Sequence, residues 1–113
     1  MEAVLRLCDQ DIEITQPAEL LGVSPRQHGH AGVLEAFAIW PEQWDDFRID
    51  ILRSADMGDH VMVTTLQGGR GRESGVHVET RFTFLFLVRA GKIAEWRIFM
   101  REQDALDAVG LTD

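Results

Sequence analysis

The segment from Gly75 to Arg101 constrains the fold of this chain more than any other part of the sequence. It reads as two long antiparallel strands joined by a tight turn at residues 89–92. Side chains alternate between the two faces of a strand, so the first strand divides into two sets. One set begins with charged residues and ends with leucines: His77, Glu79, Arg81, Thr83, Leu85 and Leu87. The other begins with valines and ends with phenylalanines: Val76, Val78, Thr80, Phe82, Phe84 and Phe86.

Both faces of this strand therefore carry apolar side chains. One face must line a core or cavity, and the other must pack on something else, such as a second subunit. We assign the face of Glu79 to the cavity and the three phenylalanines to the outside. Because three phenylalanines on a convex sheet are more apolar surface than a monomer leaves uncovered, the pattern predicts a homodimer through this sheet face.

Length and charge limit the classes of partner. The 113 residues are enough for one domain, spanning residues 1–113. The net charge of −8 argues against nucleic acid and membrane surfaces, because both attract a basic footprint. Cys8 is the only cysteine, which excludes an intrachain disulfide and suits a reducing compartment. No apolar run approaches the ~20 residues of a membrane span and no secretory signal is evident, so a cytoplasmic location is predicted.

The other elements follow from the spacing of apolar residues. Helices are predicted where these residues recur every three or four positions, and strands where they alternate. The predicted helices cover residues 2–8, 31–40 and 102–109, and the further strands cover 12–16, 47–55 and 61–67. Residues 17–29 are predicted to form a loop and residues 68–75 a flexible hairpin tip, because glycine and proline interrupt them. Helices followed by a run of strands are typical of an α+β fold with helices on one face of an antiparallel sheet.

Several short motifs occur in a fixed order along the chain: GHAG at residues 29–32 entering a helix, MGDHV at 57–61, GRGRESGVHVE at 69–79, RAGKI at 89–93 and ALDAVGL at 105–111. In this order, and over nearly the whole chain, they resemble the SnoaL-like branch of the nuclear-transport-factor-two-like superfamily. The resemblance implies a cone-shaped barrel, in which a curved antiparallel sheet wraps around helices and leaves a pocket at its open end. Members of the superfamily include polyketide cyclases, ketosteroid isomerase and limonene epoxide hydrolase.

Two features depart from the family pattern. Relatives usually begin with a long helix before the position at which this chain starts. Either the true start lies upstream of Met1, or this version lacks one wall of the cone and exposes apolar surface that a partner would have to cover. The second departure is Arg101, which stands where relatives often place an aspartate after the last strand.

The catalytic positions of the best-known members do not carry over. Gln16 stands where the steroid isomerases place a general-base aspartate, and an amide cannot take a proton from carbon. The chain has no tyrosine to act as their first oxyanion donor, and Thr83 occupies the position of the second. The aspartate–arginine–aspartate set of the epoxide hydrolases corresponds to Thr65, Gln67 and Ile98. These mechanisms are therefore not expected here.

The polar residues that remain are His77, Glu79 and Arg81, on the face assigned to the cavity. A partly buried Glu79 with a shifted pKa could act as a base, and Arg81 could hold an enolate or carboxylate oxygen. Alternatively, Glu79 and Arg81 form an ion pair that is purely structural. Glu79→Gln would weaken binding or turnover in the first case and destabilise the fold in the second. Side chains that point to bulk solvent would contradict both readings.

His30 is the third candidate catalytic residue, because it begins a helix after a long loop. It could reach the pocket as an acid or base, or it could fix the loop through a backbone hydrogen bond. His28 and His30 with Glu79 lack a second pair of ligands at a convincing spacing, so no metal is predicted, and no cofactor is predicted either.

A flat apolar ligand would suit the remaining candidates. The tryptophans could form an adaptable wall of the pocket, although ordinary core packing is the alternative. The predicted ligand-binding residues are Gln67, His77, Thr83, Trp96 and Trp40.

Two functions remain open. The first is a SnoaL-like pocket protein that binds a small apolar carbonyl compound and could isomerise, cyclise or hydrate it with Glu79, Arg81 and His30. The second is a non-catalytic ligand-binding or dimerisation module in which the polar pair is structural. In either case Phe37, Leu85 and Ile98 are predicted to be buried core, so that cutting each to alanine costs about 2–5 kcal/mol.

Overall fold

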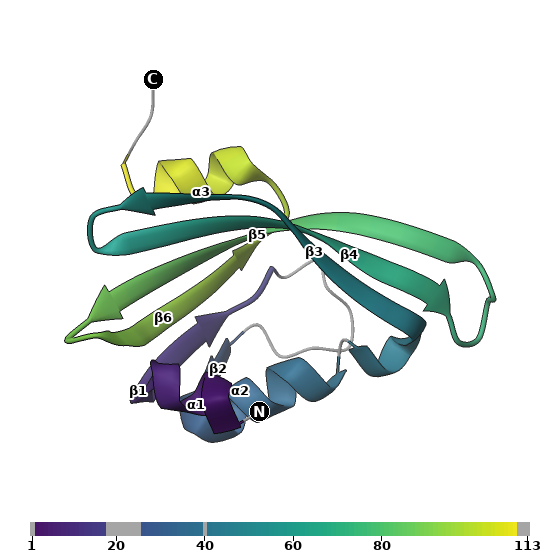
Figure 1. Cartoon of the computed structure of the whole chain (residues 1–113), viewed down its shortest axis with the longest axis horizontal. Coiled ribbons are helices and arrows are strands. Elements are labelled where there is room, and N and C mark those ends of the chain that lie inside the picture. Colours follow the sequence, from purple (N-terminus) through teal and green to yellow (C-terminus); the bar gives the residue numbers. More distant parts are fainter. Residues whose placement is uncertain (1, 18–25, 40, 111–113) are drawn as a thin grey trace.

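The computed structural model describes residues 2–17, 26–39 and 41–110 (Figure 1). Three α-helices, one short 3₁₀ helix and six strands are present in this part of the chain. None of the described helices is long and apolar enough to cross a membrane. In chain order the elements are α1 (Glu2–Leu7), β1 (Cys8–Thr15), β2 (Arg26–His28), α2 (Gly29–Ile39), η1 (Pro41–Gln43), β3 (Trp44–Met57), β4 (His60–Gly71), β5 (His77–Arg89), β6 (Lys92–Phe99) and α3 (Glu102–Ala108).

The six strands form one open, mixed sheet in the order β2-β1-β6-β5-β4-β3. Strands β3 to β6 form the predicted antiparallel meander. Strand β1 departs from the prediction, because it pairs with β6 in parallel and places Ile14 opposite Trp96. Strand β2 pairs with β1 inside a segment that was predicted to be loop. The α+β class is confirmed, with a sheet that is mixed rather than purely antiparallel.

The sheet arches over one layer of structure and carries another on its outer side (Figure 1). Strands β1 and β2 continue the sheet at its lower end, helices α1 and α2 lie under the arch, and α3 lies above it. The core under the arch is built from Cys8, Ile12, Ile14, Val33 and Trp96. A second, smaller core on the convex side joins Met62 and Leu85 to Ala105 of α3.

The two faces of β5 are the reverse of those assigned from the sequence. Phe84 and Phe86 pack against the core under the arch, whereas Leu85 is fully buried beside α3. The prediction that the phenylalanines face outward is wrong, and the dimer interface inferred from them loses its basis. Helices cover both faces of the sheet, so both sets of side chains are apolar where the helices lie. Alternation alone therefore cannot identify the concave face.

The three predicted core residues have different outcomes. Leu85 is buried with no exposed surface, as predicted. Ile98 is only partly buried, because it faces a cavity instead of a filled core. The side chain of Phe37 lies outside the described part of the structure.

Glu102 fixes α3 to the convex face of the sheet. Its carboxylate accepts hydrogen bonds from the Arg53 guanidinium of β3 and from Thr64 Oγ1 of β4 (2.9 Å). The bond from Arg53 is the largest cause that holds the pKa of Glu102 below its usual value, and partial burial opposes it. A charged Glu102 therefore ties both strands to the helix.

The hairpin between β5 and β6 turns as the sequence predicts. Ala90 and Gly91 have φ values of 49° and 76°. Positive φ at both central residues defines the type I′ turn that suits the twist of a hairpin. In the hairpin between β4 and β5, the paired strands extend further than predicted and the loop is shorter. Strand β4 continues to Gly71, and Arg70 pairs with His77.

Candidate functional site

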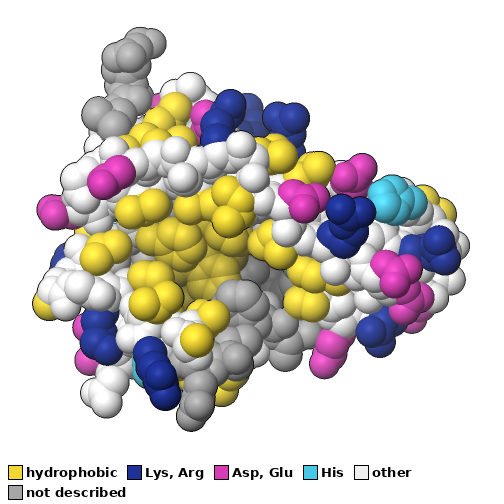
Figure 2. Space-filling model, viewed as in Figure 1, with side chains coloured by type: hydrophobic (Ala, Val, Ile, Leu, Met, Phe, Trp, Pro, Cys, Tyr) yellow, Lys and Arg dark blue, Asp and Glu magenta, His cyan; other side chains and the backbone are white. Residues whose placement is uncertain are grey.

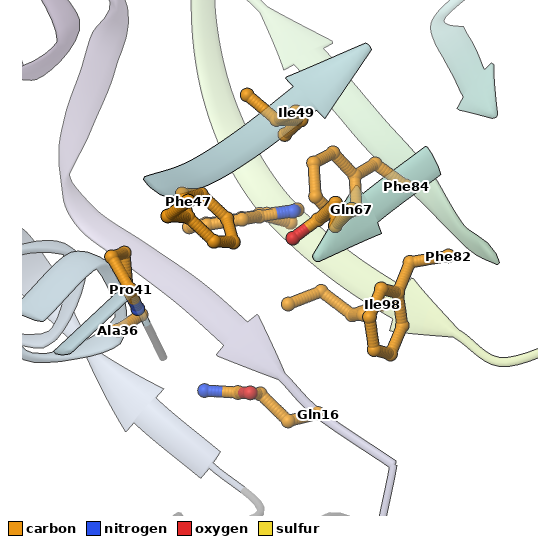
Figure 3. A pocket seen from close by; sticks show the side chains of 10 residues that line it. Gln16, Ala36, Pro41, Phe47, Ile49, Gln67, Phe82, Phe84 and Ile98 are labelled. Carbon is orange, nitrogen blue, oxygen red and sulfur yellow. The ribbon is translucent and has the colours of Figure 1, made fainter. Parts of the chain in front are cut away.

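A cavity lies between the concave face of the sheet and the end of α2 (Figure 3). Its volume is about 100 Å³. Four strands contribute side chains from above, and α2, η1 and the residue after β1 close the other side. The lining residues are Gln16, Ala36, Pro41, Phe47, Ile49, Gln67, Phe82, Phe84, Trp96 and Ile98.

Aromatic rings form one rigid wall of this cavity. Phe84 lies edge-on to Trp96, with 5.3 Å between ring centroids and an interplanar angle of 81°. Phe86 continues the cluster, 5.9 Å from Phe84 and 6.2 Å from Trp96. Edge-to-face and offset contacts at these distances are the favourable arrangements for aromatic pairs. The packing holds the rings in place, so the wall is preformed.

The cavity is open to solvent along the side of β3. Ile49 lines it and is 48% exposed, which places this side chain at the rim. Figure 2 shows hydrophobic side chains gathered in the hollow beneath the arch of β3 and β4.

Two amide side chains and the indole N–H of Trp96 are the polar groups of the described lining, and both amides are buried. Gln16 follows β1, is 9% exposed, and donates from Nε2 to Gln27 Oε1 (3.1 Å). Gln67 lies on β4, is 5% exposed, and donates from Nε2 to Thr65 Oγ1 (2.9 Å). Of the described residues that line the cavity, none has an ionisable side chain. The cavity therefore suits a neutral ligand, because an unpaired charge is costly to bury.

The structure does not bring the predicted catalytic pair to this cavity. Glu79 and Arg81 share the face of Leu85, and both are exposed. The ionic contact of Glu79 is with His77 Nε2 (3.7 Å), and their side chains are 55% and 67% exposed. The prediction that these three residues face the cavity is wrong. Both readings of the Glu79–Arg81 pair required a buried or cavity-facing pair, and neither fits this geometry.

Other predicted site residues are dispersed. Thr83 is buried on the convex side, where its hydroxyl lies 3.4 Å from that of Thr64. His30 begins α2, and its Nε2 lies 3.1 Å from the carbonyl oxygen of Cys8. This contact matches the loop-fixing alternative for His30. Trp40 lies outside the described residues. Gln67 and Trp96 are the predicted ligand-binding residues that the structure places in the cavity.

A second hollow, beside His30, contains the Cys8 thiol but, among the described residues, no activated nucleophile. Burial raises the pKa of the Cys8 thiol there, opposed by the nearby charge of Lys92. A thiol with a raised pKa is a poor nucleophile, because the thiolate is the reactive form. Within the described residues, no group of three or more histidine, cysteine or acidic side chains is placed to hold a metal ion.

Sequence reasoning missed most of the cavity wall. Phe82 and Phe84 were assigned to the outside, and Phe47 and Ile49 were recognised only as strand residues. Gln16 was considered only as the residue that stands in place of a general-base aspartate, and not as part of a cavity wall. The alternation of Phe47 and Ile49 with charged neighbours was a usable signal, since it marks the face of β3 that lines the cavity.

Comparison with known proteins relates this geometry to a family. A family model described as the SnoaL-like domain matches residues 1–96. The matched range includes the whole cavity lining except Ile98. A search of the curated proteins found no match.

Several solved structures share the fold over most of their length. TerC, co-crystallized with polyporic acid, is 21% identical, with a TM-score of 0.76 over 96% of this chain and 85% of TerC. A protein from Jannaschia sp. CCS1 described as a SnoaL-like polyketide cyclase is 15% identical, with a TM-score of 0.75 over 99% of this chain and 79% of that chain. A protein with a ketosteroid isomerase-like fold from Catenulispora acidiphila DSM 44928, in complex with trimethylamine, is 17% identical, with a TM-score of 0.73 over 97% of this chain and 82% of that chain. These similarities confirm the cone-shaped architecture.

Proposed function

Because this chain belongs to the SnoaL-like domain family, we propose that it binds a small, largely apolar molecule in the cavity under its sheet. The observation that carries the proposal is the cavity itself. It is concave, lined mainly by rings and aliphatic side chains, and supplied with two buried amides. This combination of apolar surface with a few placed polar groups is typical of small-molecule sites.

The proposed role is binding rather than turnover. A general acid or base must lie within hydrogen-bond reach of the reacting atom. Glu79 and Arg81 lie on the other face of the sheet, and His30 faces the carbonyl of Cys8. The relatives with polyporic acid and with trimethylamine show that proteins of this fold are found with small molecules bound. They do not assign either compound to this chain.

Filling the cavity should weaken binding without unfolding the protein. Ala36 lines the cavity from α2, so a phenylalanine at this position would occupy the space that a ligand needs. We expect Ala36→Phe to weaken the binding of toluene at least tenfold, and Ala36→Leu to weaken it less. Binding is measured by NMR titration of the labelled protein.

Ala108→Phe provides the matched control, because Ala108 is exposed in α3 on the opposite side of the sheet. This variant should bind toluene as the wild type does. Equal toluene affinity in folded Ala36→Phe and Ala108→Phe would contradict the proposed site.

Self-association is a second part of the proposal, although not through the phenylalanines. A second copy would remove from water several apolar side chains that stay exposed on β3 and in and just before β5. Light scattering that gives a monomer at micromolar concentration would contradict this. The exposed residues are Ile49, Ile51, Leu52, Val76 and Val78.

A cytoplasmic location also stays a prediction. It rests on the single buried thiol of Cys8. Fractionation of cells that express the tagged protein tests it, and recovery outside the cytoplasm would contradict it.

A further inference from the structure

One polar atom in the cavity has a defined orientation. Gln67 is buried, with an exposed fraction of 5%, and it lies among apolar neighbours. The two ends of an amide are usually interchangeable in a structure, and only the hydrogen-bond network can distinguish them. Around Gln67 the network does so.

Thr65 determines which end of the amide is which. The Thr65 hydroxyl donates its single hydrogen to the main-chain oxygen of Phe82 (3.1 Å). Thr65 Oγ1 can therefore only accept from Gln67, which must present its NH₂ group at 2.9 Å. The oxygen of Gln67 consequently points away from Thr65. Figure 3 shows it directed into the space bounded by Phe47, Phe84 and Ile98.

The amide oxygen of Gln67 receives no hydrogen bond from the described side chains. An amide oxygen accepts up to two hydrogen bonds. The oxygen is not among the fully buried atoms that lack a partner, so water can reach it and donate to it. A ligand that supplies a donor replaces this water without losing the hydrogen bond, whereas a hydrocarbon cannot. The same oxygen repels an anion, and the described lining offers no cation to offset that repulsion.

We propose, resting on the proposed function above, that the ligand is a neutral aromatic molecule bearing a hydroxyl group, and that Gln67 Oε1 accepts the hydroxyl hydrogen. The ring packs against Phe84 and Trp96, and the hydroxyl reaches toward β4. Gln67 is a specificity residue that favours an aromatic alcohol or phenol over the corresponding hydrocarbon.

The size of the cavity selects the probes. Its volume of about 100 Å³ is somewhat below that of an engineered apolar cavity of about 150 Å³ that binds benzene. Single-ring compounds are therefore the appropriate test molecules. p-Cresol and toluene differ by one hydroxyl group, and p-toluate adds a charge in place of that group.

The experiment compares two affinities in several variants by NMR titration. Gln67→Met keeps the shape of the side chain and removes the acceptor. We expect the ratio of p-cresol affinity to toluene affinity to fall about tenfold, which corresponds to one neutral hydrogen bond. Toluene affinity should change little, and p-toluate should bind the wild type more weakly than p-cresol.

Thr65→Val is the second variant, because it removes the hydroxyl that orients the amide while leaving Gln67 in place. It should lower the same ratio by a smaller factor. Gln103→Met is the matched control, since Gln103 is exposed in α3, and its ratio should equal that of the wild type.

Each outcome is decisive. A ratio that changes less than twofold in both Gln67→Met and Thr65→Val overturns the inference and leaves the proposed function intact, provided that toluene still binds under the sheet. Shifts confined to residues outside the cavity, for both probes, overturn the inference and the proposed function together. A fall in the ratio for Gln67→Met, with none for Gln103→Met, supports the inference.

Discussion

Gly68→Ala should destabilise the protein by about 4 kcal/mol or more, a loss that single substitutions seldom reach. A Cβ atom at this position would lie 1.9 Å from the carbonyl oxygen of Val78, on the neighbouring strand β5. The φ of 156° adds strain, since side chains rarely adopt it. Neither the oxygen nor the strand can move without breaking the pairing of β4 with β5. Urea unfolding measures the loss.

Gly75→Ala separates the clash from the backbone strain. Gly75 also has a positive φ, of 71°, but nothing lies within 4 Å of a Cβ atom there. Its substitution should cost about 1–2 kcal/mol, the penalty of a left-handed conformation alone. Equal losses in the two variants would mean that β4 and β5 do not approach closely at Gly68.

The second large effect is expected for Leu85→Ala, at about 2–5 kcal/mol. Leu85 has no exposed surface and packs with Met62 and Ala105 under α3. Removing its side chain leaves a void that one short helix cannot collapse to fill. Chemical denaturation measures the change in the free energy of unfolding.

Leu34→Ala is the matched control, because Leu34 is 45% exposed on α2. Its loss should stay below about 1 kcal/mol. A loss for Leu85→Ala that is no larger would show that α3 does not cover the convex face.

Features of the structure that depend on neighbouring residues could be predicted from the sequence. The alternation in β3 and β5 and the Ala90-Gly91 turn depend on neighbouring residues, so they were predictable. The parallel pairing of β1 with β6 was not, because it joins residues about eighty positions apart and depends on how the whole sheet curves. The short strand β2 has no independent signal, since its three residues pair only because β1 lies beside them.

The candidate site was less predictable than the fold. The phenylalanines of β5 were recognised as an important surface and placed on the wrong side, because α3 makes the leucine face apolar as well. Gln67 and Trp96 were identified among the ligand-binding candidates. The role of Gln16 could not be foreseen, because a buried amide reads in the sequence like any polar residue at the end of a strand. A cavity arises from the packing of distant elements, which periodicity does not describe.

The location of a bound ligand tests the central claim most directly. A crystal of the protein soaked with p-bromophenol would reveal the bromine by its anomalous scattering. We expect the bromine and the ring among Phe47, Phe84 and Ile98, with the hydroxyl oxygen within hydrogen-bond distance of Gln67 Oε1. A bromine peak on the convex face beside Glu79, with the space under the sheet empty, would contradict this account.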